Sequence, residues 1–293
     1  SFPTRRSSDL TSDKPIVMTS EKEEPGAWGG IHICGRAHTN AEGGKGSSEI
    51  GGAVYGGNDD ADNSGTLQYI RLEYTGFAFD EEHEANGISF YGVGNGTIVD
   101  HCQAYKGSDD GFEFFGGSVN VSNLVAVSCS DDSFDWTEGW NGKGTNLVAY
   151  QEAESTLGYD CDCLMECDNN GSNNAATPVA HPVLKNLILV GNGGSKQGIR
   201  LRAGTEVEID NAKVCGKGQP LTVETALTEN ALKNGTSKLT NITLTSELSC
   251  KEGIYTHADF IAVTSNKVDA NLSYSSFEDI KKECSWMNGS WVK

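Results

Sequence analysis

The chain has 293 residues, with 41 Asp and Glu against 22 Lys and Arg, so its formal net charge is −19 at pH 7. Such an acidic surface repels phosphate backbones and anionic lipids, which argues against nucleic acid or a membrane surface as the partner. The 36 Gly and only 6 Pro indicate a β protein rich in tight turns, because glycine allows the positive φ angles that such turns need. No apolar stretch approaches the ~18 to 20 residues of a membrane span.

The first ten residues, SFPTRRSSDL, differ in character from the rest of the chain. They are similar to translated adaptor sequence found at the ends of metagenomic reading frames. We therefore expect residues 1–13 to be a non-native or disordered leader. The natural N-terminus, with any export signal or lipid anchor, is expected to lie upstream. Residues 14–293 are predicted to form a single domain.

Short β runs closed by glycine begin this domain, at LQYIRLEYTG (67–76) and GISFYGVGNG (87–96). A repeat of 22 residues follows, in which SDDGFEFFGG at 108–117 matches SDDSFDWTEG at 130–139. An Asn-led pattern then recurs at 123–127, 146–150, 186–190, 211–215 and 241–245, and its longest step contains an inserted loop near 151–182.

Units of this size cannot bury their own apolar faces, so they must stack on one another. The period and the short strands predict an all-β fold, a parallel β-helix with coils of about 22 residues and three short strands in each coil. In the N-L-x-x-V pattern, Leu and Val are predicted to face inward and Asn to form a stacked ladder at a turn. An antiparallel sandwich is the alternative.

Four segments of the chain resemble a family of exported β-helix proteins that is common in Bacteroidetes and described as hypothetical lipoproteins or secreted proteins. They are KPIVMTSEKEEPGAWGGIHICGRA, GGNDDADNSGTLQYIRLEYTGFAF, NGISFYGVGNGTIVDHCQAYKGSDDGFEFFGG and DDSFDWTEGWNGK. The resemblance is strong over 14–200 and weak beyond. It implies a right-handed parallel β-helix of the pectin-lyase type, located at the outer membrane surface or secreted. It brings no established catalytic activity.

Carboxylates recur with the repeat. Stacking of equivalent positions about 4.8 Å apart places Asp109 on Asp131, Asp110 on Asp132 and Glu113 on Asp135. Each pair would repel by roughly 3 kcal/mol at an effective dielectric constant near 20. A bound Ca²⁺ would compensate this repulsion, because Ca²⁺ accepts irregular sets of oxygen ligands. The alternative is that these aspartates only form local turns. With Glu166 and Asp168 added from the resemblance, the predicted ligands are Asp109, Asp110, Glu113, Asp131, Asp132, Asp135, Glu166 and Asp168.

Aromatic residues alternate with these carboxylates. Phe112 and Phe134, and likewise Phe114 and Trp136, are expected to stack inward as core. Two further rings, those of Phe115 and Trp140, are predicted to form an exposed platform for carbohydrate, since a ring beside carboxylates suits a sugar.

Nine cysteines are present, and only Cys161, Cys163 and Cys167 form a tight cluster. Their spacing differs from that of a structural zinc site. One disulfide within the cluster, or none, is favoured over zinc.

Three functions are compatible with these features. The leading hypothesis is an exported, non-catalytic β-helix that binds an extracellular ligand, a glycan or a cell-surface component, and has a Ca²⁺-stabilised acidic edge. The first alternative is a Ca²⁺-dependent polysaccharide lyase, with Lys106 as the nearest base and Lys143 as the second. The second alternative is a structural spacer or adhesin module at the cell surface.

Overall fold

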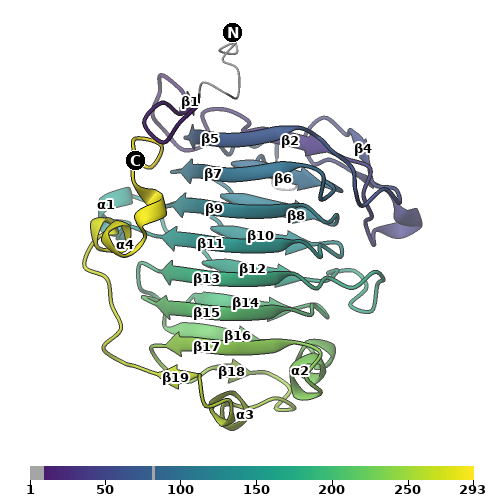
Figure 1. Ribbon diagram of the computed structural model, residues 1–293, viewed down its shortest axis with the longest axis vertical. Helices are drawn as coiled ribbons and strands as arrows, with labels where there is room; N and C mark the ends of the chain where they lie inside the picture. The colour runs from purple at the N-terminus through teal and green to yellow at the C-terminus, as the bar shows by residue number, and fades with distance from the viewer. Residues whose placement is uncertain (1–9, 81–82) are drawn as a thin grey trace.

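Two parallel sheets form the body of the protein in a computed structural model that describes residues 10–80 and 83–293 (Figure 1). The nine-stranded sheet consists, in spatial order, of β1 (Ile16–Met18), β5 (Thr66–Glu73), β7 (Ile98–Tyr105), β9 (Asn120–Val127), β11 (Lys143–Tyr150), β13 (Val183–Val190), β15 (Glu208–Cys215), β17 (Lys238–Leu244) and β19 (Lys267–Val268). The eight-stranded sheet consists of β2 (Ile31–Cys34), β6 (Ile88–Tyr91), β8 (Phe112–Phe115), β10 (Phe134–Thr137), β12 (Met165–Asp168), β14 (Gln197–Arg202), β16 (Gln219–Val223) and β18 (Ser249–Cys250).

The chain alternates between the two sheets, and every strand pairs in parallel with its counterpart in the next coil. The predicted parallel β-helix is therefore confirmed. The 22-residue offset is confirmed as well, since Phe134 lies beside Phe112 in the register of β10 and β8. The segment 151–182 contains β12 together with the short helix α1 (Glu154–Leu157), so it supplies one strand of the stack as well as loops.

The sequence predicts three strands per coil, but the structure has two parallel sheets, because two of the expected strands join into one long strand with a bend. The fourth residue of the eight-residue strands has a positive φ, for example 55° at Asn123 and 60° at Asn146. Asparagine adopts this left-handed conformation more readily than most residues. The expected three strands per coil thus appear as one short strand and one long, bent strand.

The bend residues form the predicted asparagine ladder. Asn146 donates a hydrogen bond to Asn123 at 2.8 Å, Asn186 donates to Asn146 at 3.0 Å, and Asn211 donates to Asn186 at 2.9 Å. At the upper end, Asn123 donates to Asp100 at 2.7 Å. Each amide thus satisfies the amide of the neighbouring coil.

The core fills the space between the sheets and contains the predicted rings, Phe112, Phe114, Phe134 and Trp136, all at most 2% exposed. After the bend, Leu124 points into this core as predicted. The same prediction for Val is wrong: Val127 lies on the outer face, since side chains alternate along a strand. It is nevertheless 3% exposed, which requires a cover on that face.

The C-terminal segment, residues 270–293, supplies this cover. It contains α4 (Phe277–Glu283) and η3 (Ser285–Met287) and runs back along the nine-stranded sheet toward the first coils (Figure 1). Met287 and Trp291 are fully buried against the valines of that outer face. The segment ends near β5, where the Lys293 ammonium lies 3.2 Å from the Glu73 carboxylate.

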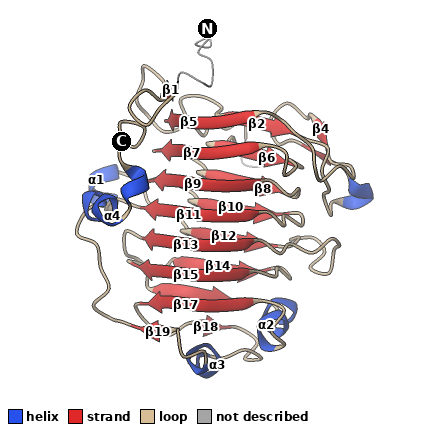
Figure 2. Cartoon of the chain, in the orientation of Figure 1, coloured by secondary structure: helices blue, strands red, loops and turns tan. Residues whose placement is uncertain are grey.

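The remaining elements are short and lie at the periphery (Figure 2). The helices α2 (Ala226–Lys233) and α3 (His257–Ala262) lie near the last coils. A small antiparallel hairpin, β3 (Gly46–Ser47) and β4 (Val54–Tyr55), follows the single turn η2 (Glu42–Gly44). Among the described residues, no helix has the length and apolar character needed to cross a membrane. All nine cysteines lie in the described part of the chain and are free.

Candidate functional site

Six carboxylates lie where the chain enters two neighbouring strands of the eight-stranded sheet. Two occupy the turn before each strand, and one is the second residue of each strand. The acidic cluster, as we name this set, consists of Asp109, Asp110, Glu113, Asp131, Asp132 and Asp135. Glu113 and Asp135 are direct neighbours in the register of β8 and β10, so the predicted stacking of the carboxylates on consecutive coils is confirmed.

Two members of the acidic cluster also hold the turns together. The Asp132 backbone N–H donates to the Asp110 carboxylate at 2.8 Å, and the Cys163 N–H donates to the Asp132 carboxylate at 2.6 Å. Each aspartate therefore links its own coil to the next one. These hydrogen bonds join one coil to the next and differ from the local turns that the sequence left open, and each uses one carboxylate oxygen of the aspartate.

A tighter subset shares one small volume. Oxygens of Asp110, Glu113 and Asp135 all lie within 4.8 Å of one another. The Asn86 amide donates to Glu113 at 2.6 Å, whereas Oδ1 of Asp135 is buried and has no hydrogen-bond partner among the residues that the structure describes. A buried carboxylate oxygen without a partner is costly, so this subset lacks a positive or donating group at that point.

Burial and mutual repulsion raise the pKa values throughout the acidic cluster. Burial, followed by the charges of Glu84 and Asp131, raises the pKa of Asp109 to about 7. Burial, followed by Asp162 and Glu166, raises the pKa of Asp131 to about 6. The pKa values of the other four members lie well above their usual range, first through burial and then through neighbouring carboxylates.

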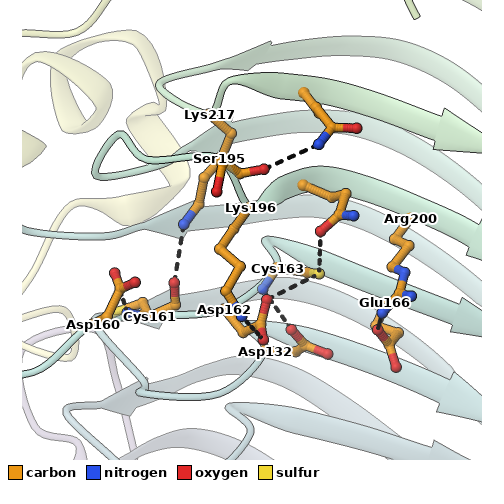
Figure 3. Close-up of polar contacts among 12 residues, drawn as sticks. Asp132, Asp160, Cys161, Asp162, Cys163, Glu166, Ser195, Lys196, Arg200 and Lys217 are labelled. Carbon is orange, nitrogen blue, oxygen red and sulfur yellow. Dashed lines mark hydrogen bonds and ion pairs between the residues drawn. The ribbon is translucent and has the colours of Figure 1, made fainter. Parts of the chain in front are cut away.

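The next strands of the same sheet balance their carboxylates with arginine. Glu166 follows Asp135 in the register. It lies 2.8 Å from Arg200 (Figure 3), and Arg202 also contacts it. Asp168 lies 2.7 Å from Arg202. Both predicted metal ligands on β12 are thus engaged by guanidinium groups. Burial raises their pKa values, and the arginines oppose that rise.

The predicted aromatic platform is wrong for Phe115. Its ring does lie on the outer face of the sheet, stacked on Tyr91 with ring centroids 4.4 Å apart. The hairpin folds over this position, and Tyr55 packs on Tyr91 at 5.1 Å. Phe115 is therefore only 7% exposed.

The platform is also wrong for Trp140, for a different reason. Trp140 points into the core, where its ring stacks on Phe114 at 4.1 Å and its Nε1–H donates to the Val119 carbonyl at 3.1 Å. It is 1% exposed.

One predicted lyase base is paired with an acid, and the other lies on the nine-stranded sheet. The Lys106 ammonium lies 2.8 Å from the Glu152 carboxylate. Burial lowers the pKa of Lys106, but the hydrogen bond to Glu152 and nearby groups raise it above its usual value. Lys143 begins β11, after β10, whereas Asp131 and Asp132 precede β10.

Several neighbours of the acidic cluster were not predicted. Asp162 lies in the turn before β12, and Lys196 pairs with it at 2.6 Å (Figure 3). The alternation of acids in DCDCLME could have revealed Asp162. Glu49 raises the pKa of Glu113 and Asp109, yet it comes from the hairpin region, and no repeat indicates that contact.

Cys163 also lies close to the acidic cluster. Its thiol and oxygens of Asp132 and Glu166 lie within 4.8 Å of one another. Burial raises the pKa of the Cys163 thiol, and nearby carboxylates raise it further. The thiol therefore stays protonated at neutral pH.

A polar groove of about 710 Å³ lies beside β10, beyond the acidic cluster. Thr137, two residues after Asp135, contributes to it, and loops from two distant parts of the chain form its walls. Its lining is rich in side-chain amides, hydroxyls and carboxylates: Asn40, Ala41, Glu42, Thr137, Glu138, Asn170, Gly171, Ser172 and Asn173.

Comparison with known proteins gives one match. A family model described as a pectate-lyase-like β-helix domain matches residues 8–293, almost the whole chain. No curated protein and no solved structure matches the chain.

Proposed function

The chain belongs to the pectate-lyase-like β-helix family, and we propose that it is an exported protein that binds extracellular glycan without cleaving it and binds Ca²⁺ at the acidic cluster. Membership supports a carbohydrate-related role at the level of the family. To this family-level role the proposal adds glycan binding, a bound Ca²⁺ and a location at the outer membrane surface or outside the cell.

The buried, unpartnered Oδ1 of Asp135 is the observation that carries the cation part. It lies with oxygens of Asp110 and Glu113 within 4.8 Å, and three carboxylates at that separation repel one another. A hard cation that accepts irregular oxygen ligands, such as Ca²⁺, would offset the repulsion between the carboxylates and would serve as the partner that Oδ1 of Asp135 lacks. Glu166 and Asp168 are left out of the proposed ligand set, because arginine already balances them.

The polar groove supports glycan as the ligand. Amides and carboxylates such as Asn40, Asn173 and Glu138 can donate to and accept from sugar hydroxyls. The groove also lies on the face of β10 that bears the acidic cluster, so a bound chain could contact both.

The protonation of the basic side chains supports glycan binding over glycan cleavage. A lyase needs an unprotonated base to remove a proton next to the substrate carboxylate. Burial lowers the pKa of Arg200, but its hydrogen bonds with Glu224 and Glu166 raise it above its usual range. Like Lys106, it is therefore held protonated. These cations balance acidic residues and are poorly suited to act as bases.

Calcium titration followed by thermal melting tests the cation. We expect the melting temperature to rise with Ca²⁺, half-maximally at about 0.1 to 1 mM as in extracellular modules. The double variant Asp135→Asn with Glu113→Gln should lose this rise, and Asp210→Asn on the other sheet should keep it. A melting temperature that is the same in EDTA and in Ca²⁺ would contradict the cation site.

Incubation with polygalacturonate and with alginate tests the rest of the proposal. We expect binding to a glycan in calorimetry or on a glycan array. We expect no increase in the ultraviolet absorbance that marks unsaturated lyase products. Such an increase would establish the lyase alternative, and absence of binding to every glycan would remove the carbohydrate part.

A further inference from the structure

Two aromatic rings outside the acidic cluster are exposed together. Phe79 is 69% exposed and Phe77 is 43% exposed, and their rings meet edge to face with centroids 5.0 Å apart. Single exposed apolar residues are common, but a paired aromatic surface beside a groove marks a binding site.

The groove beside Phe79 has about 340 Å³ and lies between two segments. Phe79 and His83 contribute to one wall, and the hairpin forms the other through Ser47, Glu49 and Gly52. The Phe79 N–H donates to the His83 carbonyl at 2.9 Å, which holds these two lining residues beside each other. The Tyr91 hydroxyl donates to Glu49 at 3.2 Å and so fixes the carboxylate in the opposite wall.

This combination of an aromatic ring, a carboxylate and hydroxyl groups suits a sugar. A pyranose whose hydroxyls are all equatorial has flat C–H faces that pack on an aromatic ring, while the hydroxyls point outward to carboxylates and hydroxyls. The charge of the region selects further. Glu49 lines the groove. After burial, the charges of Glu84 and Glu49 contribute to the raised pKa of Asp109, so these acids lie near one another. An anionic uronate would be repelled here.

We propose that this groove is a subsite for a neutral, β-linked glucose polymer, in which Phe79 stacks on one sugar ring and Glu49 accepts hydrogen bonds from its hydroxyls. The subsite deepens the proposed glycan-binding function and rests on it. It needs no cation, because the ring and the hydrogen-bonding groups make the contacts.

Calorimetric titration of the full chain with cellohexaose tests the subsite, in EDTA and again in Ca²⁺. We expect binding in both conditions. Phe79→Ala should weaken it about tenfold or more, which corresponds to loss of one ring contact. Phe79→Tyr should retain the affinity and Phe79→Leu should lose it, because only the former keeps the ring. Leu227→Ala removes another exposed apolar side chain, on α2, and should have no effect.

The outcomes separate this subsite from the proposed function. Cellohexaose binding that is unchanged in Phe79→Ala, or equal in Phe79→Leu and the parent, would overturn the subsite. Calcium-dependent binding of hexagalacturonate with no binding of cellohexaose would overturn the subsite and leave the proposed function standing. Absence of binding to any glycan would overturn both.

Discussion

The outer face of the eight-stranded sheet carries charge in two contrasting regions. On β8 and β10 the second residues are Glu113 and Asp135, and within the described part of the chain neither forms an ion pair with lysine or arginine. On β12 and β14 the same position is occupied by Glu166 and then Arg200, which pair at 2.8 Å. The two regions share one backbone geometry. We call the region on β8 and β10 the unbalanced region, and the region on β12 and β14 the balanced region.

The difference shows that stacking distance alone does not decide whether a column of carboxylates is stable. Coils about 4.8 Å apart suit an arginine, whose planar fork can contact carboxylates on both neighbouring coils. Arg200 does so with Glu166 and Glu224. Where no arginine follows, the same spacing forces protonation or, as we propose, a cation from solution.

The largest loss of stability is expected when an arginine is removed from the balanced region. Arg202→Met leaves Glu166 and Asp168 short of a partner, and Asp168 is largely buried. Loss of one partner of a buried pair costs about 3 to 5 kcal/mol, and the partial exposure of Arg202 reduces this to roughly 2 kcal/mol. Urea unfolding at neutral pH measures the change.

A surface pair provides the control for that variant. Lys238→Met breaks an exposed contact with Glu208 and should change the free energy of unfolding by less than about 0.5 kcal/mol. If both variants lose the same stability, the distinction between a balanced and an unbalanced region has no energetic meaning.

The unbalanced region should control how stability depends on pH. Because the folded pKa values of Asp109 and Asp131 are raised to about 7 and about 6, the folded state binds more protons than the unfolded state between those values and about 4. Their contribution is complete below about pH 4 and is lost as the pH rises through 6 to 7. In EDTA we expect unfolding to cost at least about 1 kcal/mol more at pH 5 than at pH 8.

Calcium should reverse that pH dependence, since it replaces the bound protons. Urea titrations at both pH values, with EDTA or with Ca²⁺, measure it. Stability that rises from pH 5 to pH 8 in EDTA would show that these carboxylates are not strained by one another.

The repeated part of the architecture was predictable because local sequence determines it. The match of 108–117 with 130–139 predicts that Glu113 and Asp135 are neighbours, and the recurring Asn predicts the ladder. Both features follow from chain spacing, which a stacked coil converts directly into contact.

Contacts between the coils and distant segments were not predictable in this way. Phe115 faces outward as an exposed ring would, but Tyr55 from the hairpin covers it. Val127 is buried because the C-terminal segment returns across it. Neither contact leaves a periodic signal, since hairpin and C-terminal segment meet the coils only once.

A neutral replacement inside the unbalanced region should be stabilising. Asp135→Asn removes one charge and provides an amide at the site of the unpartnered Oδ1. In EDTA at pH 8 we expect a gain of about 1 kcal/mol in the free energy of unfolding, together with about tenfold weaker calcium binding. Asp210→Asn is the control and should not stabilise, because Asn241 and Thr240 already donate to Asp210. A destabilised Asp135→Asn protein would argue against repulsion at this point.

The smallest effect is expected at the border between the two regions. The Lys196 ammonium lies 2.6 Å from Asp162, and its charge opposes the rise in the pKa of Asp131, so this cation acts on the unbalanced side. Because both partners are partly exposed, Lys196→Met should cost no more than about 0.5 kcal/mol. Removal of its charge should also tighten calcium binding by about two- to threefold at low salt, and this gain should shrink as salt screens the charge. Calcium titrations of Lys196→Met and of the distant Lys185→Met, at low and high ionic strength, measure this. Equal calcium affinity in both variants at low salt would place the cation away from the acidic cluster.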